Sequence, residues 1–215
     1  MAVNTVNRAE RDHRLYVWFA ILMPLIVLLG FARTYYLRGM FNGPAVPSLL
    51  VHLHGAVMTS WVLLFISQVW LVASRRTKLH MRLGIAGAVL ASLVVIVGIV
   101  TGVAAAARGH TPGPPALQFL VIPIGDVLVF GALIGLALYF RRRLDIHKRL
   151  MLVAAVSLLT PAIARIPLSF IINGGPIAFF GLTDVCLITF LAIDTIKNRK
   201  LHPAFLWATV AVIVS

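Results

Sequence analysis

Six long apolar runs divide the chain, and short polar segments separate them. A membrane-spanning helix needs about 20 mostly apolar residues, and the continuous runs lack the alternation of barrel strands. We expect transmembrane helices at Tyr16–Phe31, Leu49–Ala73, Leu83–Ala107, Leu117–Phe140, Leu150–Ile172 and Ile177–Ile196. A seventh apolar run, Pro203–Ser215, has 13 residues, too few to cross unaided. We expect a partial C-terminal span, either cut short or half inserted.

The composition fits a chain that is mostly in lipid. Of its 215 residues, 60% are hydrophobic and 12% charged, with a mean hydropathy of +0.99. Soluble domains are roughly one quarter charged. We therefore expect one all-α transmembrane domain over residues 1–215. The sequence has no GxxxxGK, HExxH or GxSxG motif, and the interspan segments are too short for a soluble catalytic domain. The pattern favours a protein that is not an enzyme.

The basic residues are distributed unevenly between the two sides of the predicted bundle. If the spans alternate in direction, 15 of the 19 Lys and Arg residues fall on the N-terminal side. Only Arg33, Arg38 and Arg108 fall on the other side, and Arg165 lies within a span. The positive-inside rule then predicts a multi-pass membrane protein with a cytoplasmic N-terminus. Topology and anionic head groups at the cytoplasmic face account for the net charge of +13, so we expect no nucleic-acid partner.

One stretch of sequence repeats at an offset of 67 residues. RRTKLHMRLGIAGAV, between the second and third spans, resembles RRLDIHKRLMLVAAV, between the fourth and fifth. His80 aligns with His147, and Arg82 with Arg149. The pattern predicts two duplicated hairpins, 48–107 and 116–172, that run in the same direction and form a four-helix core.

Four ionisable residues inside the spans are candidates for a buried site, since each costs about 3 kcal/mol in the bilayer on insertion scales. A rise of about 1.5 Å per residue places all four in the outer third of the membrane: His54, Asp126, Arg165 and Asp184. We expect Arg165 to pair with one or both of the carboxylates, which match a guanidinium bidentately. We also expect it to donate to backbone carbonyls that Pro161 and Pro167 leave free. The cluster is either a structural clamp or a site for a ligand or proton.

The histidines offer two metal sites. His52 and His54 cannot share a helix face, and we expect the deeper His54 to point inward. A metal ion there would need Asp126 or Asp184 as a further ligand.

A second histidine site lies on the cytoplasmic side. His80 and His147 match in depth through the repeat, so they could ligate a haem b whose propionates neighbouring arginines hold. The alternative is that both are ordinary interfacial histidines. Asp194 is expected to form an interfacial ion pair beside Lys197.

Several segments carry a family resemblance. FARTYYLRGMF, HLHGAVMTSWVLLFISQVWLVASRR, LHMRLG and HKRLMLVA…PAIAR resemble an uncharacterised family of small bacterial polytopic inner-membrane proteins, over most of the chain as far as 202–207. This resemblance implies a membrane-protein class but no activity. HKRLM alone resembles small proteins that assist the assembly of haem–copper oxidases. The paired histidines on a four-helix core are similar to cytochrome b561-like proteins.

Three classes of function follow from these observations. The first is an accessory or assembly protein associated with a larger membrane complex, which could be a redox complex. The second is a haem- or metal-binding electron carrier of the membrane. The third is a small proton-linked transporter that uses the outer Asp/Arg/His cluster. The first fits the small size and lack of catalytic motifs best, and the second is the main alternative.

Overall fold

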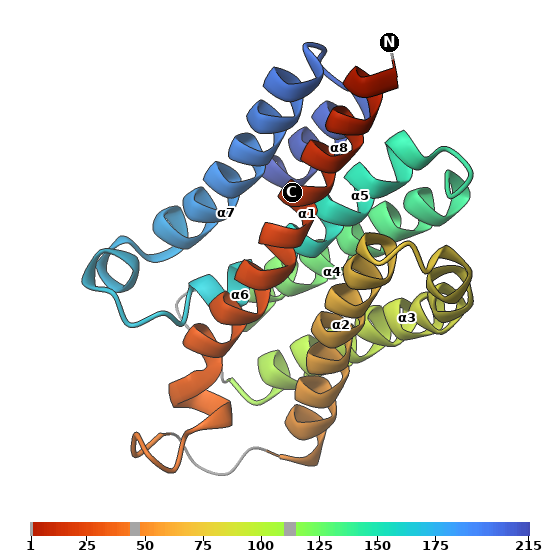
Figure 1. Ribbon diagram of the computed structural model, residues 1–215. Coiled ribbons are helices and arrows are strands. Elements are labelled where there is room, and N and C mark those ends of the chain that lie inside the picture. The colour runs from red at the N-terminus through yellow and green to blue at the C-terminus, as the bar shows by residue number, and fades with distance from the viewer. Residues whose placement is uncertain (1, 44–47, 110–114) are drawn as a thin grey trace.

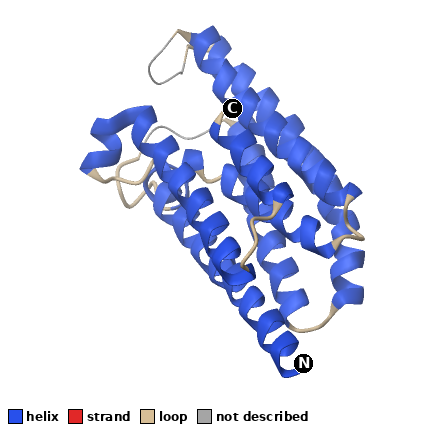
Figure 2. Cartoon of the chain, turned by 90° about the horizontal axis from the view of Figure 1, so that it is seen from above, coloured by secondary structure: helices blue, strands red, loops and turns tan. Residues whose placement is uncertain are grey.

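The protein is a bundle of helices, as expected (Figure 1). The computed structural model describes residues 2–43, 48–109 and 115–215, and within these ranges it contains helices and connections but no strand (Figure 2). The elements are α1 (Ala2–Phe31), the π-helical η1 (Ala32–Tyr36), α2 (Leu49–Ala73), α3 (Thr77–Ala107), α4 (Ala116–Tyr139), α5 (Leu144–Ser157), α6 (Thr160–Ile163), α7 (Ser169–Asn198) and α8 (Pro203–Ile213).

Six helical segments are long and apolar enough to cross a membrane. They are Leu15–Tyr36, Leu49–Ala73, Thr77–Ala107, Leu120–Tyr139, Leu144–Ile163 and Ser169–Asn198. The all-α, multi-pass class is therefore confirmed, and the second span has the bounds expected from hydropathy. The short α8 is the partial seventh helix. It packs against α4, α5 and α7 and buries Phe205 completely.

The expected fifth span, Leu150–Ile172, has the wrong bounds. The helix begins six residues earlier, at Leu144, and breaks after Ser157. Pro161 lacks the N–H that would bond to the carbonyl of Ser157, and the hydroxyl of Thr160 donates to that carbonyl instead at 3.4 Å. The single turn of α6 then ends at Ile163, and residues 169–172 belong to α7.

The helix α7 is kinked near its start. Gly175 has a φ of 54° and a ψ of −140°, a conformation that glycine adopts without a Cβ clash, and Pro176 follows it. The hydropathy pattern predicted a helix from Ile177, just beyond this kink. The structure adds residues 169–174 as a separate short helical piece before it.

The four-helix core consists of α2, α3, α4 and α5, each packed against the next. The starts of α2 and α4, at Leu49 and Ala116, are separated by the same 67 residues as the starts of α3 and α5. Trp61 on α2 and Phe130 on α4 meet edge-to-face across the core, with ring centroids 5.0 Å apart.

The helix α5 lies at the centre of the bundle. Residues 152–157 are all buried, so this helix buries its whole circumference rather than one stripe. The helices α1, α7 and α8 surround it. Phe19 of α1 packs edge-to-face on both Phe65 of α2 and Phe190 of α7.

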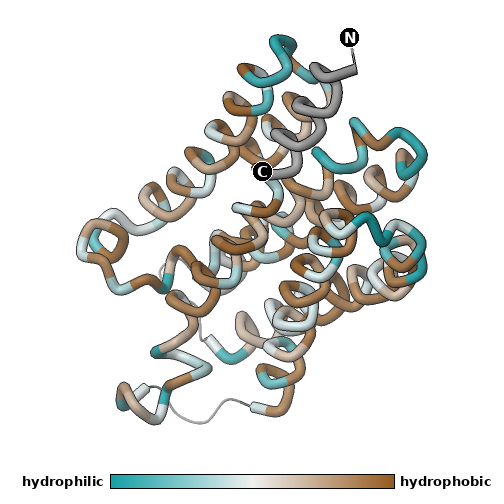
Figure 3. The backbone as a smooth tube through the Cα atoms, viewed as in Figure 1, coloured by the Kyte–Doolittle hydropathy of each residue, from teal (hydrophilic) through white to brown (hydrophobic). Residues whose placement is uncertain are grey.

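Polar residues gather where the helices are connected (Figure 3). We call one end of the bundle the basic end. It carries the α2–α3, α4–α5 and α7–α8 connections with Arg75, Arg76, Arg141, Arg142, Arg143, Arg199 and Lys200. The opposite end carries η1 and the α6–α7 connection, which includes Arg165.

A close backbone contact joins α1 to α6. A Cβ added at Gly30 would collide with the backbone carbonyl of Ala162. We expect Gly30→Ala to lower the free energy of unfolding by about 1–3 kcal/mol, measured by unfolding in mixed detergent micelles. The matched control is Gly181→Ala in α7, where an added Cβ meets nothing within 4 Å and alanine favours the helix. Equal effects of the two substitutions would contradict this packing.

Candidate functional site

The outer cluster expected around Arg165 is not assembled as predicted. Arg165 lies in the α6–α7 connection, where its guanidinium donates to the carbonyl of Pro161 at 2.7 Å and stacks over Phe31 at 4.9 Å. The backbone N–H of Arg165 bonds to Ala162 instead, so the carbonyl of Pro161 is left for the side chain. Arg165 thus donates to a backbone carbonyl, but not to one that a missing proline N–H leaves free; the carbonyl of Ser157, which Pro161 frees, accepts from Thr160 instead. The expected pairing with Asp126 or Asp184 is wrong.

The two carboxylates lie on separate helices. Asp126 is on α4 and Asp184 on α7, and both are partly exposed. Within the described parts of the chain, neither makes a hydrogen bond or ion pair. Equal depth in the membrane thus did not bring these side chains together. The cluster expected for a transport site is therefore not assembled among the residues that the structure describes.

His54 is the one member of the predicted cluster that lies near Arg165. Its imidazole lies within range of the charge on the Arg165 guanidinium. It is also close to the backbone carbonyl of Val97. Nδ1 of His54 is buried with no hydrogen-bond partner. His52 is exposed and bonds to the hydroxyl of Tyr35 at 3.2 Å. This division agrees with their spacing. No group of three His, Cys, Asp or Glu side chains suited to a metal ion occurs in the described residues.

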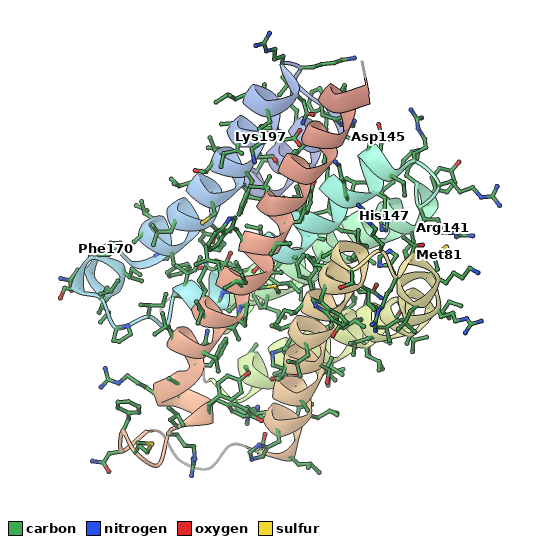
Figure 4. All side chains as sticks on the ribbon, in the orientation of Figure 1. Met81, Arg141, Asp145, His147, Phe170 and Lys197 are labelled. Carbon is green, nitrogen blue, oxygen red and sulfur yellow. The ribbon has the colours of Figure 1, made fainter. Side chains whose placement is uncertain are left out.

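The two repeat-related histidines come together at the basic end. The ring centroids of His80 on α3 and His147 on α5 are 6.5 Å apart, with ring planes at 79°. Figure 4 labels His147 and Arg141 at this end of the bundle, together with Met81 at the start of α3. The sequence offset placed these rings at one depth, and the structure brings them face to edge across the core.

The other two core helices hold these rings. Nδ1–H of His147 donates to the backbone carbonyl of Ala137 on α4 at 2.8 Å, which leaves Nε2 with a lone pair free for a ligand. The carboxamide of Gln68 on α2 contacts Nδ1 of His80 and reaches the backbone N–H of Gly84. In this orientation the carboxamide oxygen accepts from Gly84 and its NH2 donates to Nδ1 of His80. A His80 that binds a ligand through Nε2 requires the reversed carboxamide, whose oxygen would accept from Nδ1–H. Each core helix thus contributes one polar group to this site.

The helix α3 has a small residue, Gly84, near this site. Gly84 lies one turn after His80, on the same face of α3. A Cβ added there would meet nothing within 4 Å.

A buried ion pair that the sequence analysis did not predict lies next to this site. Arg149 on α5 and Asp194 on α7 form a bidentate pair, with Nε–Oδ2 and Nη2–Oδ1 distances of 2.9 Å. Their side chains are 5% and 3% exposed. Asp194 was expected to form an interfacial ion pair beside Lys197; it does form an ion pair, but the pair is buried and the cation is Arg149. Arg149 was read as one of the topological charges of the inner loop.

The pair belongs to a network that joins three helices. Nη1 of Arg149 donates to the backbone carbonyl of Asp145 at 2.7 Å. The side chain of Asp145 accepts from Nε2 of His202, which precedes α8, at 3.2 Å. Thus α5 is fixed to both α7 and α8 on one face, while His147 points to α4 from another.

A signal for the ion pair was present in the sequence. The chain has only six acidic residues, and Asp145 and Arg149 are spaced i, i+4 on one helix face. The repeat could not reveal the pair, because Arg82, which aligns with Arg149, is exposed in the structure.

The comparisons with known proteins leave the family open. No protein-family model, no curated protein and no solved structure matches the chain. The resemblances drawn from the sequence therefore stay predictions, and the geometry alone must support a function.

The buried ion pair can be tested by a double-mutant cycle. We expect Asp194→Leu to lower the free energy of unfolding by about 3–5 kcal/mol, because it leaves a buried guanidinium without its carboxylate. Arg149→Met together with Asp194→Leu should restore much of this loss. The measurement is unfolding in mixed micelles.

Asp145→Asn is the control for that cycle, because it alters the exposed pair with His202 and should cost less than about 1 kcal/mol. The account fails if Asp194→Leu costs no more than this control, or if the double variant is as unstable as the single one.

Proposed function

We propose that the protein is a haem b-binding electron carrier of the bacterial inner membrane, with the haem between His80 and His147. In this proposal the basic end faces the cytoplasm and its anionic lipid head groups, as the distribution of Lys and Arg predicts. Bound there, haem would supply one-electron transfer.

The spacing of the two rings is the observation that carries the proposal. Metal–imidazole bonds of about 2 Å on opposite sides of one ion place the two ring centres roughly 6 Å apart. The observed centroid distance is 6.5 Å. The hydrogen bond from His147 to Ala137 is the kind of contact that orients a ligating imidazole and raises its basicity.

The residues around His80 and His147 suit the porphyrin ring and the propionates of haem b. Gly84 lies one turn after His80, and a Cβ added there would meet nothing within 4 Å. Arg82, Arg141 and Arg142 are exposed at the same end, where guanidinium groups could bind propionate carboxylates bidentately. The apolar walls of α2–α5 would exclude water from the macrocycle.

Absorption spectra test the proposal directly. The purified protein, expressed in cells that make haem b, is expected to show a Soret band that shifts on reduction with dithionite, and a pyridine extract should contain haem b. His80→Ala and His147→Ala should each abolish the band or strongly reduce it. His52→Ala is the matched control and should leave it unchanged, because His52 is exposed at the opposite end. A colourless wild-type protein after haem supplementation would refute the proposal.

A second candidate, an accessory role in a larger membrane complex, is favoured by α7. In the most apolar 18-residue stretch of this helix, only 11% of the residues are buried within the protein. Asp184 lies in that helix with no hydrogen bond or ion pair among the described residues. A carboxylate in hydrocarbon is costly unless it is paired. A partner helix that presents Lys, Arg or another donor would stabilise it.

The size of the protein in its native membrane tests this second function. We expect the wild type, after mild solubilisation and blue native electrophoresis, to migrate well above the 23.4 kDa chain. Asp184→Leu should migrate as the free chain because the polar contact is lost. Val185→Leu changes the neighbouring exposed position and should migrate as the wild type. Migration of all three proteins as free chains would exclude a stable complex through this face.

A further inference from the structure

An open groove lies at the basic end between α4, α5 and α8. Its volume is about 640 Å³. The walls are mainly apolar and include Leu133, Leu136, Leu150, Trp207 and Ala211. Arg143 and Lys200 lie at its polar mouth. We call this the α8 groove.

The mouth of the α8 groove is positively charged. Arg143 and Lys200 are both exposed. Asp145 is the one carboxylate among the lining residues, and its oxygen already accepts from His202 at 3.2 Å. Arg143 and Lys200 are the two permanently charged cations of the lining.

The walls continue from this mouth along the transmembrane surface. Leu136 and Trp207 are 49% and 68% exposed, so the groove opens sideways on apolar side chains rather than into the core. In a bilayer, such an opening faces acyl chains. Trp207 of this wall lies in the first half of α8, and its ring is both apolar and a hydrogen-bond donor, as suits the membrane interface.

We propose that the α8 groove binds one anionic phospholipid, whose phosphate lies between Arg143 and Lys200 and one of whose acyl chains lies along the apolar wall. Basic pockets between transmembrane helices hold such head groups. A soluble anion would use only the mouth and leave the apolar wall empty. The proposal needs the bundle to lie in a bilayer and does not depend on haem at His80 and His147.

The internal repeat supplies a matched comparison. Arg76 and Arg143 precede α3 and α5 at the same repeat position, as the residues before the first helical turn. Arg76 stacks over Trp70 at 5.4 Å. The helix α8 packs on α4 and α5, so the groove belongs to the second hairpin. Substitutions in the first hairpin change the same charge without touching the groove.

Native mass spectrometry of the detergent-purified full chain tests the proposal. The probes are phosphatidylglycerol and phosphatidylcholine with the same acyl chains. We expect tighter binding of one phosphatidylglycerol. At about one kcal/mol for each cation, Arg143→Gln with Lys200→Gln should weaken that binding about 30-fold. Arg75→Gln with Arg76→Gln should leave it within about twofold of the wild type.

Two further experiments distinguish binding of the lipid head group from binding of its acyl chain. Ala211→Trp fills the apolar wall, so it should weaken binding of phosphatidylglycerol while the charges stay in place. Soluble glycerol 3-phosphate should not displace the lipid at equal concentration.

The proposal is overturned if both lipids bind equally well, or if the two arginine-containing double variants weaken binding to the same extent. Displacement by glycerol 3-phosphate would also overturn it, because the ligand would then be a free phosphate rather than a lipid.

Discussion

The ion pair between Arg149 and Asp194 is the contact on which the arrangement at the basic end depends. Two charges in a region of low dielectric are tolerated only when they are paired and their remaining donors are satisfied. Here the guanidinium binds both carboxylate oxygens and a backbone carbonyl. This requirement fixes the rotation of α5 about its axis relative to α7, because any other rotation would leave one charge unpaired.

The rotation of α5 in turn determines where His147 points. His147 lies two residues before Arg149, so the two side chains leave the helix on different faces. With Arg149 directed at α7, the imidazole reaches the carbonyl of Ala137 on α4 and meets His80 of α3. A structural ion pair and a candidate ligand pair thus use opposite sides of one central helix. The groove beside α8 uses the same helix end, where Asp145 holds His202.

Much of the architecture could be predicted from the sequence because it follows from apolar length and charge placement. Residue spacing along the chain determines the six spans and the partial α8. It also determines that His80 and His147 lie at the same depth. The break in the fifth span was harder to place. Hydropathy stays high across residues 150–172, and the prolines show where hydrogen bonds are lost but not whether the helix bends or ends.

The arrangement around the helix axes could not be predicted in the same way. Depth arguments placed Arg165, Asp126 and Asp184 at one level, but contact also requires that their helices be neighbours and that the side chains face each other. Conversely, Arg149 is one of several basic residues near the α4–α5 connection, and the positive-inside rule already accounts for such a group. Arg149 is buried because α7 covers that face of α5, and this packing belongs to the tertiary structure. The repeat could not reveal it, because the first hairpin has no such cover.

The most direct measurement of the central claim is low-temperature electron paramagnetic resonance of the oxidised, haem-supplemented protein. The account predicts a low-spin ferric signal of two imidazole ligands, and its replacement by a high-spin signal or its loss when either His80 or His147 becomes alanine. A high-spin signal in the wild type, or a low-spin signal that survives both substitutions, would contradict a haem held by these two residues.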